Sequence, residues 1–406
     1  MNPAPVYDPT NEATRRNPFP LYESLQEQDP VHWSPAVRSW IITRYDDVRQ
    51  VVLSPTMSSD RLRPFYEALR DERREILSGV IRYLNEWLVF KAAPEHTRLR
   101  KMMNAVFSLQ MIHAREPQIR RTVEDLFAAV ESGRPFDFMK DVAVLLPAYV
   151  ILDMMGLPRS DFPLIKAWSD DLRLFIGTSR ADEDKYRKAR SGADHMSAYF
   201  RNIIEQRRAQ PGEDVITKMM QAQDEKGSLN EDELVAMCML VLFGGHETTT
   251  NLLGSAVVAL LEHPQQQQLL RDNPQLMDSA VEEFLRYDGP SNSIARVVAV
   301  DHELQGKALR AGDRVFAMIN AANRDPRRFD RPHELDIQRS PNRHLTFGQG
   351  LHFCLGAPLA RLETKVCISA LLSGFSSMHF GDGEVHWLDA LVMRGPANLP
   401  LVLRQA

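Results

Sequence analysis

The chain has 406 residues, of which 44% are apolar and 25% are charged. This composition is ordinary for a globular protein and excludes the disordered, collagen-like and disulfide-stapled classes. The formal charge of −5, from 49 Lys and Arg against 54 Asp and Glu, gives no reason to expect a nucleic acid or an anionic membrane as a partner.

The chain shows no targeting or membrane segment. The N-terminus has neither a basic region nor an apolar run, so we expect no secretory signal. The longest strongly apolar stretch without charges is residues 234–245, whereas a membrane-spanning helix needs roughly 20 residues. Three cysteines are too few for a disulfide framework. We therefore expect a soluble protein in the reducing cytoplasm.

Short elements open the chain. Residues 31–33 and 39–43 flank a proline-containing turn and predict a small β-hairpin. From Asp46 onward the apolar spacing becomes helical, and residues 61–86 are consistent with irregular surface helix.

The rest of the chain is mainly helical in pattern. Residues 94–262 are mostly amphipathic helical stretches separated by Pro or Gly. Strand patterns return at residues 296–300 and 314–319, and again around 385–387 and 399–403. Because the strands are few, short and scattered, the sequence predicts a mainly α fold with a minor β portion.

One predicted helix is unusually long. Ser228 and Glu231 form a capping box, and the helical pattern runs from there to Pro264, about 50 Å at 1.5 Å per residue. Its middle is apolar around most of its surface, so we expect it to be buried. The same middle holds glycines 244–245, which cost about 1 kcal/mol each, and the carboxylate of Glu247, which is costly to bury alone. A ligand lying against the helix would compensate for both.

The most informative segment reads F-G-Q-G-L-H-F-C-L-G, over residues 347–356, and we call it the cysteine loop. It delivers Cys354 to the start of a helix expected from Leu355 onward, where backbone N–H groups and the helix dipole favour a thiolate. Glycines at 348 and 350 let the backbone approach a flat ligand closely. A thiolate held in this way is a strong ligand for haem iron, and its electron donation favours O–O cleavage. A buried structural cysteine in a turn is the alternative.

The cysteine loop resembles the haem-ligand loop of the cytochrome P450 family, F-G-x-G-x-H-x-C-x-G. The resemblance spans essentially the whole chain and is closest to the soluble bacterial type. It implies a cytochrome P450 fold with a long central helix crossing over the haem, in a single haem domain over residues 1–406 without a fused reductase. It also implies haem b (iron protoporphyrin IX) with Cys354 as the axial thiolate and the metal ligand.

Three further segments match motifs of this family. Residues 244–248, G-G-H-E-T, resemble the oxygen-activation motif A/G-G-x-D/E-T, with Gly where Ala is commoner. In the family the acid and the threonine relay protons, which assigns catalytic roles to Glu247 and Thr248. Taken alone, a Glu-Thr pair in a helix is weak evidence.

Glu283 and Arg286 match the family's E-x-x-R, whose i, i+3 spacing allows a charge-assisted pair. In the family this pair locks the segment that leads to the cysteine. Arg339 is the expected third member, although Leu335 stands where the family usually has Phe.

His96 and Arg100 resemble the H-x-x-x-R at the start of the family's third major helix, and their i, i+4 spacing places them on one face. Together with Arg296 and His352 they would hold the two haem propionates, because partly buried carboxylates need cations nearby. Without the resemblance, a His–Arg pair is more often surface decoration.

The family fold would place the substrate across the haem from Cys354. The expected lining is mostly apolar and predicts a lipophilic substrate, with a polar part at 291–293 that would orient an oxygen-bearing one; filling of the core is the alternative for each apolar residue. The candidates are Leu84, Trp87, Val89, Phe90, Leu240, Val241, Gly244, Ser291, Asn292, Ser293, Ile294, Leu391, Val392 and Met393.

The resemblance implies a monooxygenase that inserts one atom of O2 into a C–H or C=C bond. Electrons from NAD(P)H would come through a ferredoxin or flavodoxin with its reductase, and a monomer is the expected state. Arg98 and Lys101 either present positive charge to such an acidic partner or form a solvated face.

Two alternative functions remain at this point. The first is a hydrogen-peroxide-driven peroxygenase of the same fold, against which Glu247 and Thr248 argue. The second is a non-enzymatic haem protein that senses gas or carries a ligand.

Overall fold

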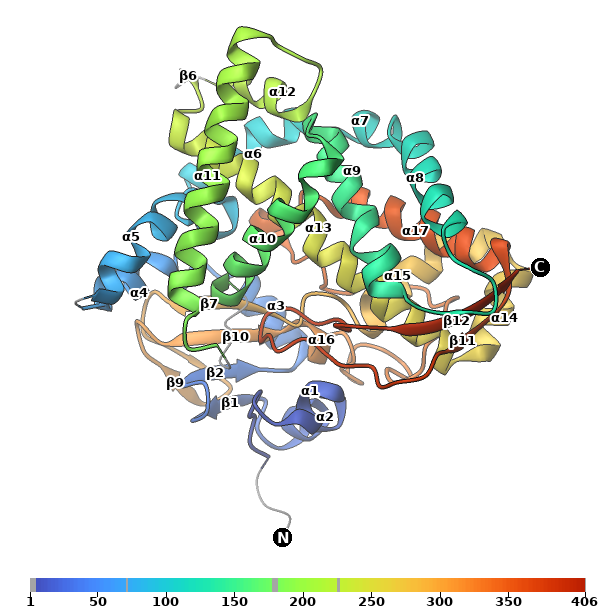
Figure 1. The fold of residues 1–406 in the computed structure, drawn as a ribbon. Helices are drawn as coiled ribbons and strands as arrows, with labels where there is room; N and C mark the ends of the chain where they lie inside the picture. Colours follow the sequence, from blue (N-terminus) through green and yellow to red (C-terminus); the bar gives the residue numbers. More distant parts are fainter. Residues whose placement is uncertain (1–4, 71, 177–181, 225–226, 406) are drawn as a thin grey trace. The chain divides into compact units, whose positions relative to one another are not determined.

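The structure is a computed structural model that describes residues 5–70, 72–176, 182–224 and 227–405. The chain forms two compact units. The first comprises Met1–Met57, Arg115–Pro147 and Glu247–Ala406, and the second comprises Ser58–Ala114 and Ala148–His246. Helices predominate and strands are short, which confirms the predicted mainly α fold with a minor β portion (Figure 1).

The largest sheet has five strands in the order β1-β2-β10-β7-β3. β1 and β2 form the predicted hairpin, with Val31 opposite Ile42. β10 runs parallel to β2 and antiparallel to β7, so Val315 lies between Trp40 and Arg296. The strands are β1 (Val31–Ser34), β2 (Ser39–Ile42), β3 (Met57–Ser58), β7 (Ser293–Val298) and β10 (Arg314–Met318).

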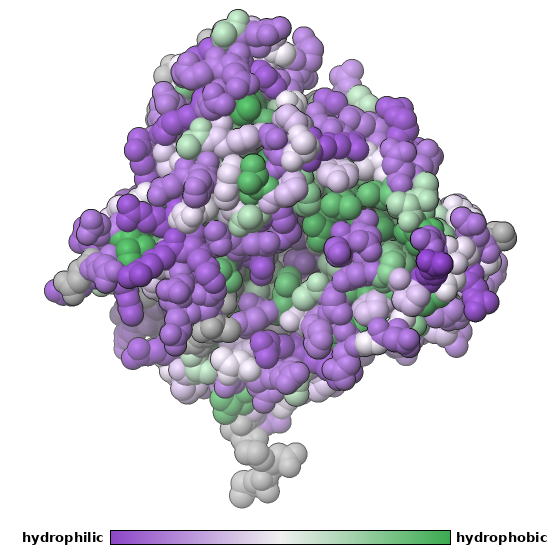
Figure 2. Space-filling view, viewed as in Figure 1, coloured by the Kyte–Doolittle hydropathy of each residue, from purple (hydrophilic) through white to green (hydrophobic). Residues whose placement is uncertain are grey.

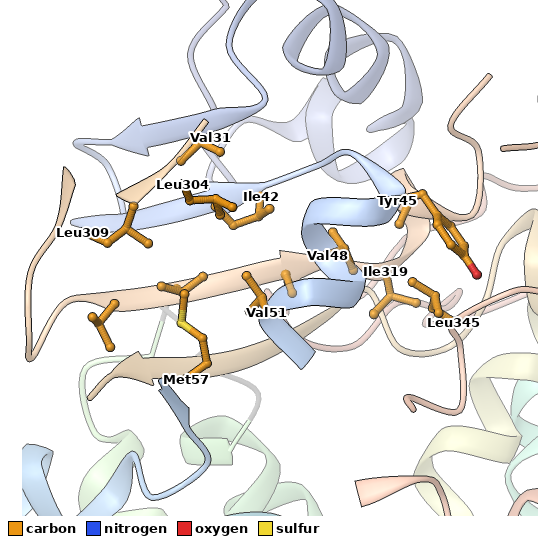
Figure 3. Packing of buried hydrophobic residues seen from close by; sticks show 14 of the residues in the cluster. Val31, Ile42, Tyr45, Val48, Val51, Met57, Leu304, Leu309, Ile319 and Leu345 are labelled. Carbon is orange, nitrogen blue, oxygen red and sulfur yellow. The ribbon is translucent and has the colours of Figure 1, made fainter. Parts of the chain in front are cut away.

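Helix α3 (Tyr45–Leu53) covers one face of this sheet with apolar side chains (Figure 3). Val48 and Val51 are three residues apart, so they lie on one helix face, and both are buried against Ile42 and Ile319. Each fully buried aliphatic side chain of this size contributes about 1.5–3 kcal/mol. Leu345 belongs to the same cluster and stands two residues before the cysteine loop, so this core fixes the start of the loop.

The first unit also contains a three-stranded antiparallel sheet, in the order β11-β12-β4, and several helices, of which α17 packs against α8 and α15. The remaining elements of this unit are α1 (Glu12–Arg16), α2 (Phe19–Gln28), α8 (Glu116–Ala128), β4 (Pro135–Asp137), η2 (Met139–Ala143), α14 (Pro264–Asp272), η4 (Pro274–Leu276), α15 (Met277–Tyr287), β8 (His302–Leu304), β9 (Lys307–Leu309), α16 (Ile319–Ala322), η5 (Gly350–His352), α17 (Ala357–Gly374), β11 (Phe375–Phe380) and β12 (Pro400–Gln405).

The second unit is built mainly from helices, and α9 (Leu145–Met155) begins in the first unit and ends in the second. Helices α10 and α11 of the second unit lie side by side (Figure 1). Gly192 permits this close contact, because a Cβ there would lie 2.7 Å from the Trp168 carbonyl oxygen. The elements are α4 (Leu62–Ala68), α5 (Glu72–Leu84), η1 (Leu88–Phe90), α6 (Glu95–Val106), α7 (Leu109–His113), η3 (Arg159–Asp161), α10 (Phe162–Ile176), α11 (Lys185–Ala209), α12 (Val215–Gln221), β5 (Gln223–Asp224) and β6 (Gly227–Ser228).

The predicted long helix is α13 (Glu231–Glu262), but its capping box lies two residues later than expected. Asn230, and not Ser228, accepts the Glu233 N–H through its side chain at 2.9 Å, and the Asn230 N–H donates to the Glu233 carboxylate at 2.9 Å. Ser228 is instead paired with Gln223 in a short hairpin, which holds it in extended backbone and away from the helix start.

The two glycines in the middle of α13 have different surroundings. A Cβ on Gly245 would lie 2.9 Å from the Ile151 side chain, so close packing accounts for this glycine. Gly244 is exposed, although most of its helix is buried, and a Cβ there would meet no atom within 4 Å. The expectation of a ligand against the helix therefore depends on Gly244 and not on Gly245.

Two predicted elements differ from the structure. Within residues 61–86, α5 buries Leu77 and Leu84 completely, so this helix is not confined to the surface as expected. The strand predicted around 385–387 is only a single bridge between Trp387 and Pro396. The sequence pattern did not predict β11, because its pairing with β12 joins segments distant in the chain.

None of the helices in the described part of the chain is both long and apolar enough to cross a bilayer. Hydrophilic residues dominate the face seen in Figure 2, and hydrophobic residues gather on it in separate patches.

We expect Gly254→Ala to lower the free energy of unfolding by about 1–3 kcal/mol, because overpacking strains a filled site. The new methyl group would lie 2.5 Å from the Met139 sulfur and 2.6 Å from Pro396 Cγ. Gly244→Ala is the matched control on the same helix. It meets no neighbour, so we expect it to stabilise the helix by up to about 1 kcal/mol. Urea unfolding followed by circular dichroism measures both; equal destabilisation would contradict the packing explanation.

Candidate functional site

The cysteine loop is closed by its own backbone and by two glycines. Gly348 and Gly350 have φ values of +69° and +70°, in the left-handed region that favours glycine. A Cβ on Gly350 would also lie 2.7 Å from the Leu53 side chain. The N–H of Cys354 donates to the Phe347 carbonyl oxygen at 2.9 Å. These features hold the cysteine in one place.

Cys354 stands at the N-terminus of α17, which begins at Ala357, two residues later than predicted. Its Sγ lies 4.0 Å from the position of a Cβ on Gly356, the N-cap residue, and the residue is half-buried. The positive end of the helix dipole and the N–H groups of the first turn stabilise an anion there. The position therefore favours a thiolate, which is a soft metal ligand.

A fully buried ion pair connects α15 to the segment before the loop. Arg286 donates to both carboxylate oxygens of Glu283 at 2.7 Å, and neither side chain is exposed. Arg339 lies 3.2 Å from the same oxygens, which confirms it as the third member. The other N–H groups of Arg286 donate to the carbonyl oxygens of Asn323, Pro332 and Glu334. Because the buried charges are paired and hydrogen-bonded, the network fixes the path of the chain here.

Arg296 is a buried cation on β7, 5% exposed. Its guanidinium donates to the Ala295 carbonyl at 3.0 Å, and among the described residues no carboxylate forms an ion pair with it. Burial lowers the pKa of Arg296 to about 10, so it stays charged at neutral pH. The same strand passes the cysteine loop, since Ile294 lies 3.7 Å from the Cβ position of Gly348. A carboxylate brought by a ligand would supply the missing counter-ion.

The predicted histidines lie in different units. His352 is half-buried in η5, within the cysteine loop of the first unit. His96 is 1% exposed on α6 of the second unit. Burial and the charge of Arg100 lower the pKa of His96 to about 4, so at neutral pH it offers a hydrogen bond and not the positive charge we expected. Arg100 is half-buried on the same helix and donates to Asn104 at 2.9 Å.

Glu247 and Thr248 lie in the middle of α13, in the same unit as Cys354 and Arg296. Glu247 is buried and Thr248 is half-buried. Consecutive positions of one helix thus carry an acid and a hydroxyl, two groups that can each hold and pass protons.

Sequence reasoning missed an ion pair between α15 and α17. Arg361 donates to both oxygens of Glu282 at 2.6 and 2.9 Å, and its guanidinium lies 4.5 Å from the centre of the Phe347 ring. These residues are far apart in the chain, so spacing carried no signal. Glu363 on α17 was also missed, although the residues three and four positions away on either side are apolar, which was a visible signal; it is completely buried.

Comparisons with known proteins agree with this geometry. The family model "Cytochrome P450" matches residues 65–385. Putative cytochrome P450 YjiB of Bacillus subtilis (strain 168) is 34% identical over 373 residues, covering 91% of this chain and 90% of the relative. Vitamin D(3) 25-hydroxylase of Pseudonocardia autotrophica is 35% identical over 394 residues, covering 96% and 94%. The crystal structure of P450BioI in complex with hexadec-9Z-enoic acid ligated acyl carrier protein has a TM-score of 0.89 at 30% identity, covering 97% of this chain and 99% of that one.

The chain belongs to the cytochrome P450 family. The predicted cytochrome P450 fold is thereby confirmed, and the protein is a haem-thiolate monooxygenase with haem b as its cofactor. The comparisons favour neither the peroxygenase nor the gas sensor or ligand carrier.

The residues of this P450 fit the cofactor. Cys354 offers a sulfur anion at a helix N-terminus, and the buried cation of Arg296 lacks a protein carboxylate among the described residues. The loop glycines allow the turn that presents the sulfur, and the α13 surface is open at Gly244. Haem is planar, carries carboxylates and has an iron that binds a thiolate, so these features fit it.

Two expectations about neighbouring residues are wrong. Within 291–293, Asn292 and Ser293 are buried and donate to the Leu391 carbonyl at 3.2 and 3.0 Å, so only the half-buried Ser291 stays a candidate to orient a substrate. Arg98 presents no charge to a partner, because its side chain is only 13% exposed and is paired with Glu233.

Glu363 gives the protein a pH-dependent stability. Burial raises its pKa well above the ordinary value of 4.5, and neither carboxyl oxygen has a hydrogen-bond partner among the described residues. As the pH rises above about 4.5, the Glu363 carboxyl loses its proton in the unfolded chain but keeps it in the folded chain. The free energy of unfolding therefore falls by up to about 1.4 kcal/mol per pH unit until the folded pKa is reached.

We expect Glu363→Gln to remove this slope, so that the variant gains stability relative to the parent as the pH rises from about 5 to about 8. Urea unfolding at several pH values measures the difference. Glu282→Gln is the contrasting control: burial alone would raise the pKa of Glu282, but hydrogen bonds from Arg361 and His344 lower it to about 2. The stabilisation by Glu282 is thus lost as the pH falls from about 4.5. A constant difference between Glu363→Gln and the parent would contradict a protonated Glu363.

Proposed function

We propose that Cys354 is the axial ligand of the haem iron and that Arg296, His352, His96 and Arg100 bind the propionates. The observation that carries this proposal is the Cys354 sulfur at the N-terminus of α17, in a loop closed by the Cys354 N–H itself. The buried charge of Arg296 supports its role toward a carboxylate. His96, being neutral, would donate a hydrogen bond, and Arg100 would supply the charge beside it.

We propose that Glu247 and Thr248 manage the protons of the reaction, in which R–H, O2, two electrons and two protons give R–OH and water. When bound, the haem supplies the iron at which oxygen is activated. Thr248 Oγ1 would hold a proton at the reacting side of α13, and the Glu247 carboxyl would replace it. The thiolate of Cys354 would donate electron density that favours O–O cleavage.

We infer that the substrate is a small lipophilic molecule. Val89 is exposed, so the second unit offers apolar surface where lining was expected. Trp87, two residues before it, is buried with its ring 5.5 Å from that of Phe243. The names of similar proteins include a vitamin D(3) 25-hydroxylase and a structure in complex with hexadec-9Z-enoic acid ligated acyl carrier protein. Vitamin D(3) and the fatty acid are both lipophilic. A spectral screen with fatty acids and sterols would show which class displaces the water on the iron.

We propose a ferredoxin or a flavodoxin with its reductase as the electron donor, and NAD(P)H as the electron source. The exposed basic side chain of Lys101 on α6 supports an acidic partner. The single domain over residues 1–406, the monomeric state and the location in the cytoplasm stay predictions.

We expect Arg296→Met to release haem about tenfold faster than the parent, because a propionate would lose its buried counter-ion. Arg324→Met is the matched control. Arg324 is another buried arginine of the first unit, its pKa likewise lowered to about 10 by burial, but it lies between the rings of Phe19 and Tyr287. Haem transfer to apomyoglobin measures the rate. The assignment of Arg296 is wrong if both variants release haem equally fast.

We expect Thr248→Ala to yield about tenfold less product per NADH, because electrons then leave as hydrogen peroxide when proton delivery fails. NADH oxidation, product and peroxide are measured together, with a surrogate ferredoxin and its reductase. Thr250→Ala, a buried threonine two positions along α13, is the control and should stay coupled. Unchanged coupling in Thr248→Ala would contradict its role, and faster turnover of the parent with peroxide than with NADH would identify a peroxygenase.

A further inference from the structure

Two side chains that share a carboxylate partner contact one aromatic residue of the cysteine loop. Glu282 on α15 accepts from Arg361 at 2.6 and 2.9 Å, and its second oxygen lies 3.1 Å from His344 Nε2. The Arg361 guanidinium lies 4.5 Å from the Phe347 ring centre, and the His344 ring lies 5.9 Å from it. All four residues belong to the first unit. Phe347 is thus held by a cation on one helix and an imidazole on the preceding segment.

The hydrogen bonds define the orientation of His344. Its Nδ1 accepts the Thr346 N–H at 3.3 Å, so in the neutral ring Nε2 carries the hydrogen and donates to Glu282. The His344 side chain is only 4% exposed. The imidazole therefore connects the carboxylate of α15 to the backbone immediately before Phe347.

Phe347 in turn contacts the cysteine directly. Its carbonyl oxygen accepts the Cys354 N–H at 2.9 Å, and its ring lies 6.2 Å from that of Phe353, the residue before the cysteine. A shift of Phe347 would therefore alter the backbone that presents the sulfur. Groups around a metal ligand tune the metal through such contacts even when they do not touch it.

The network persists across the neutral pH range. Burial would raise the pKa of Glu282, but the hydrogen bonds from Arg361 and His344 hold it at about 2. Glu282 therefore stays ionised, and the bidentate geometry fixes the plane of the Arg361 guanidinium over the ring.

We propose that Glu282, His344 and Arg361 are positioning residues for the haem ligand: they hold Phe347 so that its carbonyl stays bonded to the Cys354 N–H, and they thereby set the reduction potential of the iron. This inference rests on the proposed binding of haem by Cys354. None of the three residues is a ligand, and each acts through Phe347.

The same two helices provide a matched control pair. Lys365 on α17 and Asp278 on α15 form an ion pair at 2.7 Å. Each is displaced by four residues, about one helical turn, from Arg361 and Glu282 respectively. The control pair therefore links the same helices without a contact to Phe347 among those that position its ring.

The test is a spectroelectrochemical titration of the haem-loaded full chain. We expect Arg361→Gln and Glu282→Gln each to change the equilibrium constant of one-electron reduction at least threefold, about 30 mV at 59 mV per decade. Both shifts should have the same sign, because both variants release Phe347. Asp278→Asn and Lys365→Gln should change the constant less than twofold.

Opposite signs in Arg361→Gln and Glu282→Gln would overturn the proposal, because a purely electrostatic effect lowers the potential when a cation is lost and raises it when an anion is lost. Unchanged potentials would overturn it too. If Arg361→Gln does not retain haem, Arg361→Lys replaces it: lysine keeps the charge but neither stacks as a plane nor binds bidentately, so the shift should persist. Full restoration by lysine would again mean a charge effect and overturn the proposal.

A second readout separates this inference from the proposed haem ligation. The reduced carbon monoxide complex of the parent and of every variant should show the long-wavelength thiolate band that gives the family its name. Absence of the band in the parent would refute ligation by Cys354 and this inference with it. A normal band with unshifted potentials in the variants would overturn only the positioning role.

Discussion

A sulfur anion in a protein is stabilised by a positive potential, and the N-terminus of α17 supplies that potential beside Cys354. The other features of the first unit serve to keep that sulfur in place. The glycines at 348 and 350 allow the turn, the sheet core reaches Leu345 just before it, and the Phe347 carbonyl accepts the Cys354 N–H. The site is thus held by backbone geometry, and its chemistry follows from one side chain.

The buried charges of the first unit fall into three physical cases. Glu283 and Arg286 form a completely paired network, which holds the chain path and has no capacity left for a ligand. Arg296 is a buried cation without a carboxylate partner among the described residues, and such a charge is retained where a ligand completes it. Glu363 is a buried acid that avoids the cost of ionisation by keeping its proton. Only the second case points to the cofactor.

Much of the fold and of the candidate site followed from local pattern. The first hairpin, α3 and the long α13 depend on spacing within a few residues, and so does the Glu283–Arg286 pair. The errors arose where a neighbour distant in the sequence decided the outcome. Ser228 is held in a hairpin instead of capping α13, and Arg98 is paired with Glu233 instead of facing solvent.

The sequence by itself determined the identity of the chemistry, because a cysteine among fixed glycines at a helix start is a local arrangement that ten residues specify. It also determined which residues were candidates for protons and for propionates. Only the tertiary structure decided their state: His96 is neutral because burial and Arg100 make it so, and Phe347 is clamped because Glu282, His344 and Arg361 meet around it. Protonation and second-layer contacts depend on solvent exclusion and on neighbours brought together by folding, and neither can be read from spacing along the chain.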